Sequence, residues 1–257
     1  MTKQIPKQNF FDFFRQRLTN LKQVGDLLPK VSLRLQASFE PEFNVLLAAE
    51  LDALAKYWSI NQHPPLTRDA AFRWGEFLAR NANPAWSKCS YLNMMERART
   101  EALAAKQGHK PKPRELSNPK QQEAILDTVL GKVLPPDVRV PYAVIGWESD
   151  PTLSDLSAHR EIIEAGISEE WLRRSRYGEI LYRHHRCGWI HALDPGRELA
   201  TDVVLKLGAD YPPHYIDTNG TRKLAIPPEY ILASLEQAIT NFEKDIPDGA
   251  SIMLEEQ

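Results

Sequence analysis

Apolar residues recur at helical spacing through the first hundred positions of the chain. Spacings of three and four residues place them on one face of a helix, which is the face that a helix buries. Pro29 ends the first such segment and Pro41 begins the second, because proline suits only the first turn of a helix. Thr67 and Asp69 supply capping oxygens before the third segment. We therefore predict helices over 8–28, 41–58, 70–80 and 90–106.

The middle of the chain is less regular. Residues 107–114 are basic and interrupted by prolines, which predicts an exposed loop, with a tethered RNA-contacting arm as the alternative. Helices are predicted over 119–133 and 154–164. No internal repeat is present, so we interpret 1–257 as a single helical domain with 107–165 as an irregular insertion or loop region.

The last third changes its pattern twice. Ser168 can cap a long helix that continues to about position 193, where Asp194-Pro195-Gly196 stops it. Strand-like segments follow at 203–205, 215–217 and 222–226, with Asn219-Gly220 as a hairpin turn. Pro227-Pro228 then begins a final helix. The predicted fold is an all-α, mainly helical bundle with a small β-hairpin inserted before the last helix.

Composition narrows the class of protein. The 257 residues are 42% hydrophobic and 26% charged, as in ordinary globular proteins. A formal net charge of −2 argues against nucleic-acid binding by the whole surface, although a local basic cleft stays compatible. Two cysteines, Cys89 and Cys187, make no disulfide framework, and no secretory signal or membrane-spanning run is seen. We expect a soluble cytoplasmic protein without a membrane partner.

Protonatable and cationic side chains are concentrated in residues 181–191, Leu-Tyr-Arg-His-His-Arg-Cys-Gly-Trp-Ile-His. This stretch holds three of the seven histidines together with two arginines and one cysteine. Imidazole transfers protons near neutral pH, and guanidinium is suited to holding phosphate. A polynucleotide phosphodiester is therefore the first substrate class to consider. Attack by a ribose 2′-OH needs a base, an acid and a cation but no metal, and it restricts the substrate to RNA.

Three other interpretations of this segment stay open. His184, Cys187 and His191 fall within a 60° sector of a helix, but about 10 Å separates the two histidines along its axis, which is long for one metal ion. Cationic neighbours favour a Cys187 thiolate nucleophile. Alternatively, Arg183 pairs with Glu179 on a solvated helix face. The candidates for a fourth metal ligand are Cys89, His159 and His214.

Arg186 and His191 have the spacing Arg-x4-His. On an ideal α-helix this spacing puts their side chains about 140° apart, so they do not stack as an i, i+4 pair. The long arginine side chain could still converge on the imidazole at a helix end, but two copies of the segment across a dimer axis would complete one site more naturally. A homodimer is therefore predicted along with the site.

The pattern Leu181-Tyr182-Arg183-x-x-Arg186-Cys187-Gly188-x-x-His191 resembles the Arg-x4–6-His motif of HEPN domain proteins. The likeness extends to the alanine-rich segment 45–58, to 71–78 and to the closing segment 226–232. It implies an up-and-down helical bundle whose paired domains form a metal-independent endoribonuclease without a cofactor, often with a toxin or defence role.

The resemblance also implies roles for individual residues. His191 would be the acid and base, and Arg186 would bind or polarise the phosphate. Residues that would contact RNA are Tyr182, Arg183, His184, His185 and Cys187. Active members commonly carry a polar residue directly after the motif arginine, where this chain has Cys187, a weak hydrogen-bond donor. A non-catalytic module that binds nucleotide or RNA, or that mediates protein interactions, is the alternative.

Overall fold

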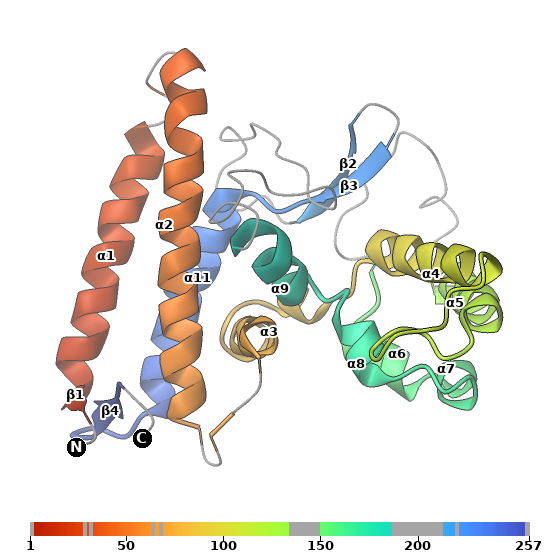
Figure 1. The fold of residues 1–257 in the computed structure, drawn as a ribbon. Coiled ribbons are helices and arrows are strands. Elements are labelled where there is room, and N and C mark those ends of the chain that lie inside the picture. Colours follow the sequence, from red (N-terminus) through yellow and green to blue (C-terminus); the bar gives the residue numbers. More distant parts are fainter. Residues whose placement is uncertain are drawn as a thin grey trace.

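The computed structural model describes residues 3–27, 30, 33–62, 65–66, 69–133, 150–186, 213–218 and 221–254. Side chains are described in these ranges except at 33–41, 133, 184–186, 216–218 and 221–222. The described chain is mainly helical with small antiparallel strand pairs, which confirms the predicted fold class (Figure 1). None of its helices is long and apolar enough to cross a membrane.

Long helices form the first of two packed units. α1 (Lys7–Leu27), α2 (Leu33–Ile60) and α11 (Pro228–Asp245) lie side by side, and α3 (Ala70–Asn81) packs across α2 and α11 (Figure 1). Their predicted apolar faces meet in a core rich in aromatic rings. That core includes Phe10, Phe11, Phe14, Phe43, Trp58, Phe77 and Phe242. Edge-to-face ring contacts, such as Phe11–Phe242 at 5.3 Å, add to the burial.

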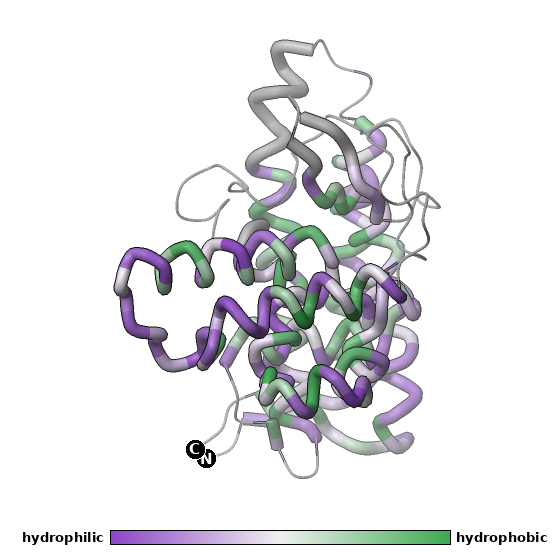
Figure 2. Tube along the Cα trace, turned by 90° about the vertical axis from the view of Figure 1, so that its right-hand side faces the viewer, coloured by the Kyte–Doolittle hydropathy of each residue, from purple (hydrophilic) through white to green (hydrophobic). Residues whose placement is uncertain are grey.

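Shorter helices form the second unit around a separate cluster of buried side chains. α4 (Tyr91–Lys106) packs on α5 (Pro119–Val133), beside α6 (Leu153–Ala158), α7 (Arg160–Glu164) and α8 (Glu169–Arg173). The helix predicted over 119–133 is confirmed at those bounds. Hydrophobic positions gather where the helices face one another, and hydrophilic positions cover the outer turns (Figure 2).

Two antiparallel strand pairs complete the described fold. β2 (His214–Thr218) pairs with β3 (Thr221–Ala225) in the register Thr218↔Thr221, which confirms a hairpin with a two-residue connection before the last helix. The predicted strand 203–205 and the turn itself lie outside the described residues. Sequence reasoning missed the other pair, in which β1 (Gln4–Pro6) meets β4 (Ser251–Met253) near the two ends of the chain (Figure 1).

Helix α2 begins eight residues earlier than predicted, at Leu33 and not at Pro41. The backbone stays helical through Pro41, which therefore lies in a helix interior. Proline there removes one backbone hydrogen bond, but the preceding residues Leu33-Arg34-Leu35-Gln36-Ala37 are strong helix formers. The helix propensity of these residues therefore outweighs the helix-breaking effect of Pro41.

The long helix predicted over 168–193 is wrong within its described part. The chain instead forms α8, α9 (Tyr177–Ile180) and a π-helical segment, η5 (Leu181–Arg186). The break has a non-local cause, because the backbone at 175–177 bonds to the segment before α4. The Tyr177 N–H donates to the Lys88 carbonyl at 3.0 Å, and the Ser90 N–H donates to the Ser175 carbonyl at 2.7 Å.

A buried carboxylate joins the two units at this break. Asp150 accepts hydrogen bonds from the hydroxyls of Tyr177 and Tyr215, each at 2.5 Å, and from the Tyr91 N–H at 3.2 Å. Burial raises the pKa of Asp150 to about 7, although these hydrogen bonds oppose the shift. The Asp150 carboxylate therefore links α4 of the second unit to α9 and to strand β2 of the hairpin.

Candidate functional site

Two glycines bring α3 and α9 into backbone contact. A Cβ atom on Gly178 would lie 2.7 Å from the Cα of Gly75, closer than real Cβ contacts allow. A Cβ on Gly75 would overlap the Glu179 carboxylate and lie 2.5 Å from Nη2 of Arg176. Glycine at both positions is therefore required for this approach, which fixes where η5 begins relative to α3.

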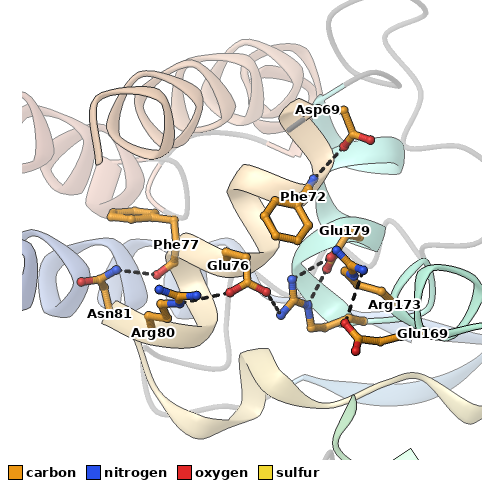
Figure 3. Close-up of polar contacts among 10 residues, drawn as sticks. Asp69, Phe72, Glu76, Phe77, Arg80, Asn81, Glu169, Arg173 and Glu179 are labelled. Atoms are coloured by element: carbon orange, nitrogen blue, oxygen red, sulfur yellow. Dashed lines mark hydrogen bonds and ion pairs between the residues drawn. The ribbon is translucent and has the colours of Figure 1, made fainter. Parts of the chain in front are cut away.

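A buried ion cluster lies directly over this contact. Arg176 is 3% exposed and binds Glu179 through Nε at 2.8 Å and Nη2 at 2.7 Å. Its Nη1 bonds to Glu76 at 2.9 Å, and Glu76 also accepts from Nε of Arg80 at 3.1 Å (Figure 3). Burial raises the pKa of Glu179, and the bidentate bonds from Arg176 oppose that shift. The cluster holds α3 against α9, and one of its members, Glu179, also lines a pocket.

The pocket lies between the two units and has a volume of about 570 Å³. Volumes of this size are typical of small-molecule sites, which often lie between structural units. Part of its wall is the N-terminus of α3, residues 69–72, and another part comes from α8 and the residue after it. Its charged and aromatic lining residues are Asp69, Phe72, Arg114, Glu170, Arg173, Arg174, Glu179, Tyr182 and Arg183. Four of these residues are arginines and three carry carboxylates, so we call this pocket the arginine pocket.

Arg173 is the most buried cation of the arginine pocket. The residue is 8% exposed, and its guanidinium carbon lies 4.7 Å from the centroid of the Phe72 ring. One terminal nitrogen lies 3.4 Å from the exposed Glu169 carboxylate, while Nε is buried and has no acceptor in the described part of the chain (Figure 3). Nε has no accessible surface, so the guanidinium contributes positive charge to the wall of the pocket but no Nε–H donor to its interior.

Arg174 and Arg114 contribute at the edge of the pocket. Arg114 forms an exposed ion pair with Glu170 at 3.0 Å, which is worth little in water. Arg174 donates to the Arg114 carbonyl at 3.5 Å, and within the described residues it forms no ion pair with a carboxylate. The guanidinium of Arg174 is therefore available for an incoming anion.

The N-terminus of α3 adds backbone donors on the opposite wall. Asp69 caps the helix, accepting from the Phe72 N–H at 2.9 Å through its side chain and from the Arg73 N–H at 3.1 Å through its carbonyl. Neither bond uses the N–H groups of Ala70 and Ala71, the first two residues of the helix. Free N–H groups at a helix N-terminus attract anions.

The structure places part of the predicted segment at this pocket. Tyr182 and Arg183 line it, and Tyr182 also packs edge-on against Trp74 at 5.1 Å. Arg186 ends η5, but its side chain and those of His184 and His185 are not described, and Cys187 and His191 lie outside the described residues. η5 is π-helical over Leu181–Arg186, where an α-helix was predicted.

The pocket residues that sequence reasoning missed are Arg173, Arg174 and the start of α3. The basic run Arg173-Arg174-Ser175-Arg176 is visible in the sequence. Which of its arginines reach the pocket depends on the break between α8 and α9, which the sequence does not predict. Arg114 belongs to the basic segment predicted as an exposed loop or an RNA-contacting arm. Contacts between segments about forty to a hundred positions apart, not local pattern, assemble the pocket.

The residues named as candidates for a fourth metal ligand lie on separate elements. Cys89 is fully buried, and burial raises the pKa of its thiol. His214 begins β2, and His159 lies between α6 and α7. Among the described residues, no group of three or more His, Cys, Asp or Glu side chains is arranged to hold a metal ion.

No protein-family model, curated protein or solved structure matches this chain. The resemblance to HEPN proteins therefore rests on the motif and the helical pattern alone. The chemistry of the arginine pocket has to be inferred from its own residues.

Proposed function

We propose that this protein is a metal-independent endoribonuclease that cleaves RNA with Arg186 and His191 beside the arginine pocket. One observation carries the proposal: Tyr182 and Arg183 line the same pocket as Arg173 and Arg174. Arg186 follows Arg183 by three residues in η5, less than one turn of a π-helix. A phosphate held by the pocket arginines therefore lies close to the start of the motif. Short π-helical segments are also common at functional sites.

The proposed reaction needs only side chains for proton transfer. The ribose 2′-oxygen attacks phosphorus as its proton passes to an imidazole, and the bond from phosphorus to the 5′-oxygen breaks as that oxygen gains a proton. The products are a 2′,3′-cyclic phosphate and a 5′-hydroxyl. His191 supplies the imidazole, and Arg186 stabilises the charge on the phosphorane. We further propose that two copies of the chain form a homodimer, which supplies a second imidazole as the acid, and that the enzyme acts on RNA in the cytoplasm.

Incubation of the purified protein with mixed RNA in EDTA tests the proposal. We expect fragments that end in 2′,3′-cyclic phosphate. Arg186→Ala and His191→Ala should each lower the rate by about a hundredfold or more, the usual worth of acid–base or charge-stabilising groups. Arg160→Ala is the matched control, because among the described residues Arg160 pairs with Glu164 alone, on the exposed surface of α7. Cleavage that survives His191→Ala unchanged would refute the mechanism.

A non-catalytic module that binds RNA or nucleotide is the second candidate. Cys187 favours it, because a thiol is a weak hydrogen-bond donor where active members of the resembled family carry a polar group. The arginine pocket serves such a module equally well, since its donors hold phosphate without cleaving it. RNA binding without any cleavage in the same assay would select this candidate.

A further inference from the structure

Residues 107–114, which we call the basic loop, connect α4 to α5 and are all exposed. They include Lys110, Lys112 and Arg114 and no acidic residue, although acidic residues outnumber basic ones by 34 to 32 in the whole chain. Within the described part of the chain, neither lysine forms an ion pair or a hydrogen bond through its ammonium group. The described protein therefore leaves the positive charge of both lysines to the solvent.

Backbone hydrogen bonds hold both ends of the basic loop. At its start, the N–H groups of Gly108 and His109 donate to carbonyls in the last turn of α4 at 3.2 and 3.0 Å, the pairing that commonly ends an α-helix at a glycine. Just beyond its end, the N–H of the buried Leu116 donates to the Glu101 carboxylate of α4 at 2.8 Å. The basic loop is therefore built onto α4 and is not a tethered arm.

Prolines restrict the backbone between these two ends. Pro111 and Pro113 have a fixed φ, and the residues before them, Lys110 and Lys112, favour extended backbone. The two lysines therefore keep a similar spacing whether or not a ligand is bound. Binding through them costs less conformational entropy than binding through a flexible arm.

Arg114 occupies a backbone position that favours glycine. The Glu115 N–H donates to the Lys112 carbonyl at 3.0 Å and closes a turn in which Pro113 is second and Arg114 third. The φ of Arg114 is 72°, as the third residue of a type II turn requires, and glycine is usual there because other residues are strained. The side chain of Arg114 lines the arginine pocket, so the positive charge of the basic loop continues into that pocket.

We propose that the basic loop binds the phosphate backbone of an RNA strand that continues into the arginine pocket. The proposal rests on the proposed function for RNA as the polyanion. Lysine and arginine contacts to successive phosphates supply affinity without reading sequence, because they release the counterions condensed on the strand. Lys110 and Lys112 hold the strand outside the pocket, and Arg114 holds it at the entrance.

Other acidic partners fit the basic loop less well than a polynucleotide does. The loop has no aromatic or large aliphatic side chain that could insert into a lipid bilayer beside its lysines. Interfaces with folded proteins have aromatic or apolar groups at their centre and few lysines, which is the opposite composition. A nucleic-acid backbone needs only the exposed cations that the loop supplies.

Salt-dependent binding of a labelled oligonucleotide to the full-length protein tests this surface. The probe is a short single-stranded 2′-O-methyl RNA, which keeps the backbone charge but has no 2′-hydroxyl for the proposed cleavage. Fluorescence anisotropy gives the binding constant from about 0.05 to 0.2 M salt. Since each phosphate contact on a single strand contributes about 0.7 to the slope of log K against log salt, Lys110→Gln with Lys112→Gln should reduce the slope by about 1.4. At 0.1 M salt, affinity should fall about twentyfold.

Two further variants separate this surface from the overall charge and from the fold. Lys22→Gln with Lys132→Gln changes the net charge equally at exposed ion pairs elsewhere, so it should keep the wild-type slope. Arg114→Gly should reduce the slope by about 0.7. Its urea midpoint should stay the same or rise, because glycine suits the positive φ of this position.

The surface is overturned if the oligonucleotide does not bind, if the variant of both loop lysines keeps the wild-type slope, or if the control variant loses as much affinity. Binding of phosphatidylserine vesicles, and not of the oligonucleotide, through the same lysines also overturns it. Cleavage kinetics distinguish the surface from the proposed function. Lysine-dependent binding without RNA cleavage overturns the ribonuclease alone, whereas cleavage with an unchanged KM in the variant of both loop lysines overturns the surface alone.

Discussion

Gly75→Ala tests whether the glycine contact between α3 and α9 builds the pocket wall. The added methyl overlaps the Glu179 carboxylate and lies 2.5 Å from Arg176 Nη2, where carbon contacts of about 3.5 Å or more are normal. The substitution gains about 1 kcal/mol of helix propensity, since Gly75 lies in the middle of α3. Disrupting a buried ion pair costs about 3–5 kcal/mol. The free energy of unfolding should therefore fall by about 2–4 kcal/mol.

Urea unfolding followed by far-ultraviolet circular dichroism measures this change. Gly25→Ala is the matched control, because its methyl would lie 3.5 Å from the nearest atom of Phe43, an ordinary contact. It should leave stability unchanged or raise it by up to about 1 kcal/mol. If Gly75→Ala unfolds at the same urea concentration as Gly25→Ala, the helix contact does not require glycine and the reasoning is refuted.

Three further predictions concern groups outside the glycine contact. Since the native pKa of Asp150 is about 7 and its unfolded value is about 4, the native state holds one more proton between these values. Its contribution to stability therefore falls as pH rises through that window, and Asp150→Asn should remove this slope from urea midpoints measured between about pH 5 and pH 8. Asp69→Ala should lower the free energy of unfolding by about 1 kcal/mol through loss of the α3 cap, while Asp69→Ser should restore most of it. In a Cys187→Ser background, Cys89 should react with a thiol reagent only after unfolding, because it is fully buried; rapid labelling of the native protein would contradict that burial.

Signals carried by neighbouring residues were sufficient to predict several of the helices. The apolar period of α1 and α11, and the caps Asp69 and Ser90 before α3 and α4, are properties of neighbouring residues. The break before Tyr177 was not predictable in this way, because a distant backbone segment provides its hydrogen bonds. Helical periodicity continues through the break in the sequence and gives no warning of it.

The residues of the candidate site also include some that the sequence predicted and some that it did not. The sequence singled out Tyr182 and Arg183 by the density of polar chemistry around them, and the structure places both at the arginine pocket. The role of Arg173 became visible only from its burial over Phe72, and that of the start of α3 only from its position at the pocket. Pairing of donors from distant elements is a tertiary property. The roles of Arg186 and His191 stay predictions.

The pairing of β1 with β4 also determines how the chain can be rearranged. The Leu254 N–H donates to the Lys3 carbonyl at 2.9 Å, so a short linker would join the two ends without moving either strand. New ends could then be opened in the exposed loop 107–113, giving a circular permutant with the same contacts. In that permutant only β4, the linker and β1 separate α11 from α1, so the packing of these two helices changes from a contact between distant parts of the chain to a more local one. Folding should then be faster, because contact order falls while the native structure is unchanged.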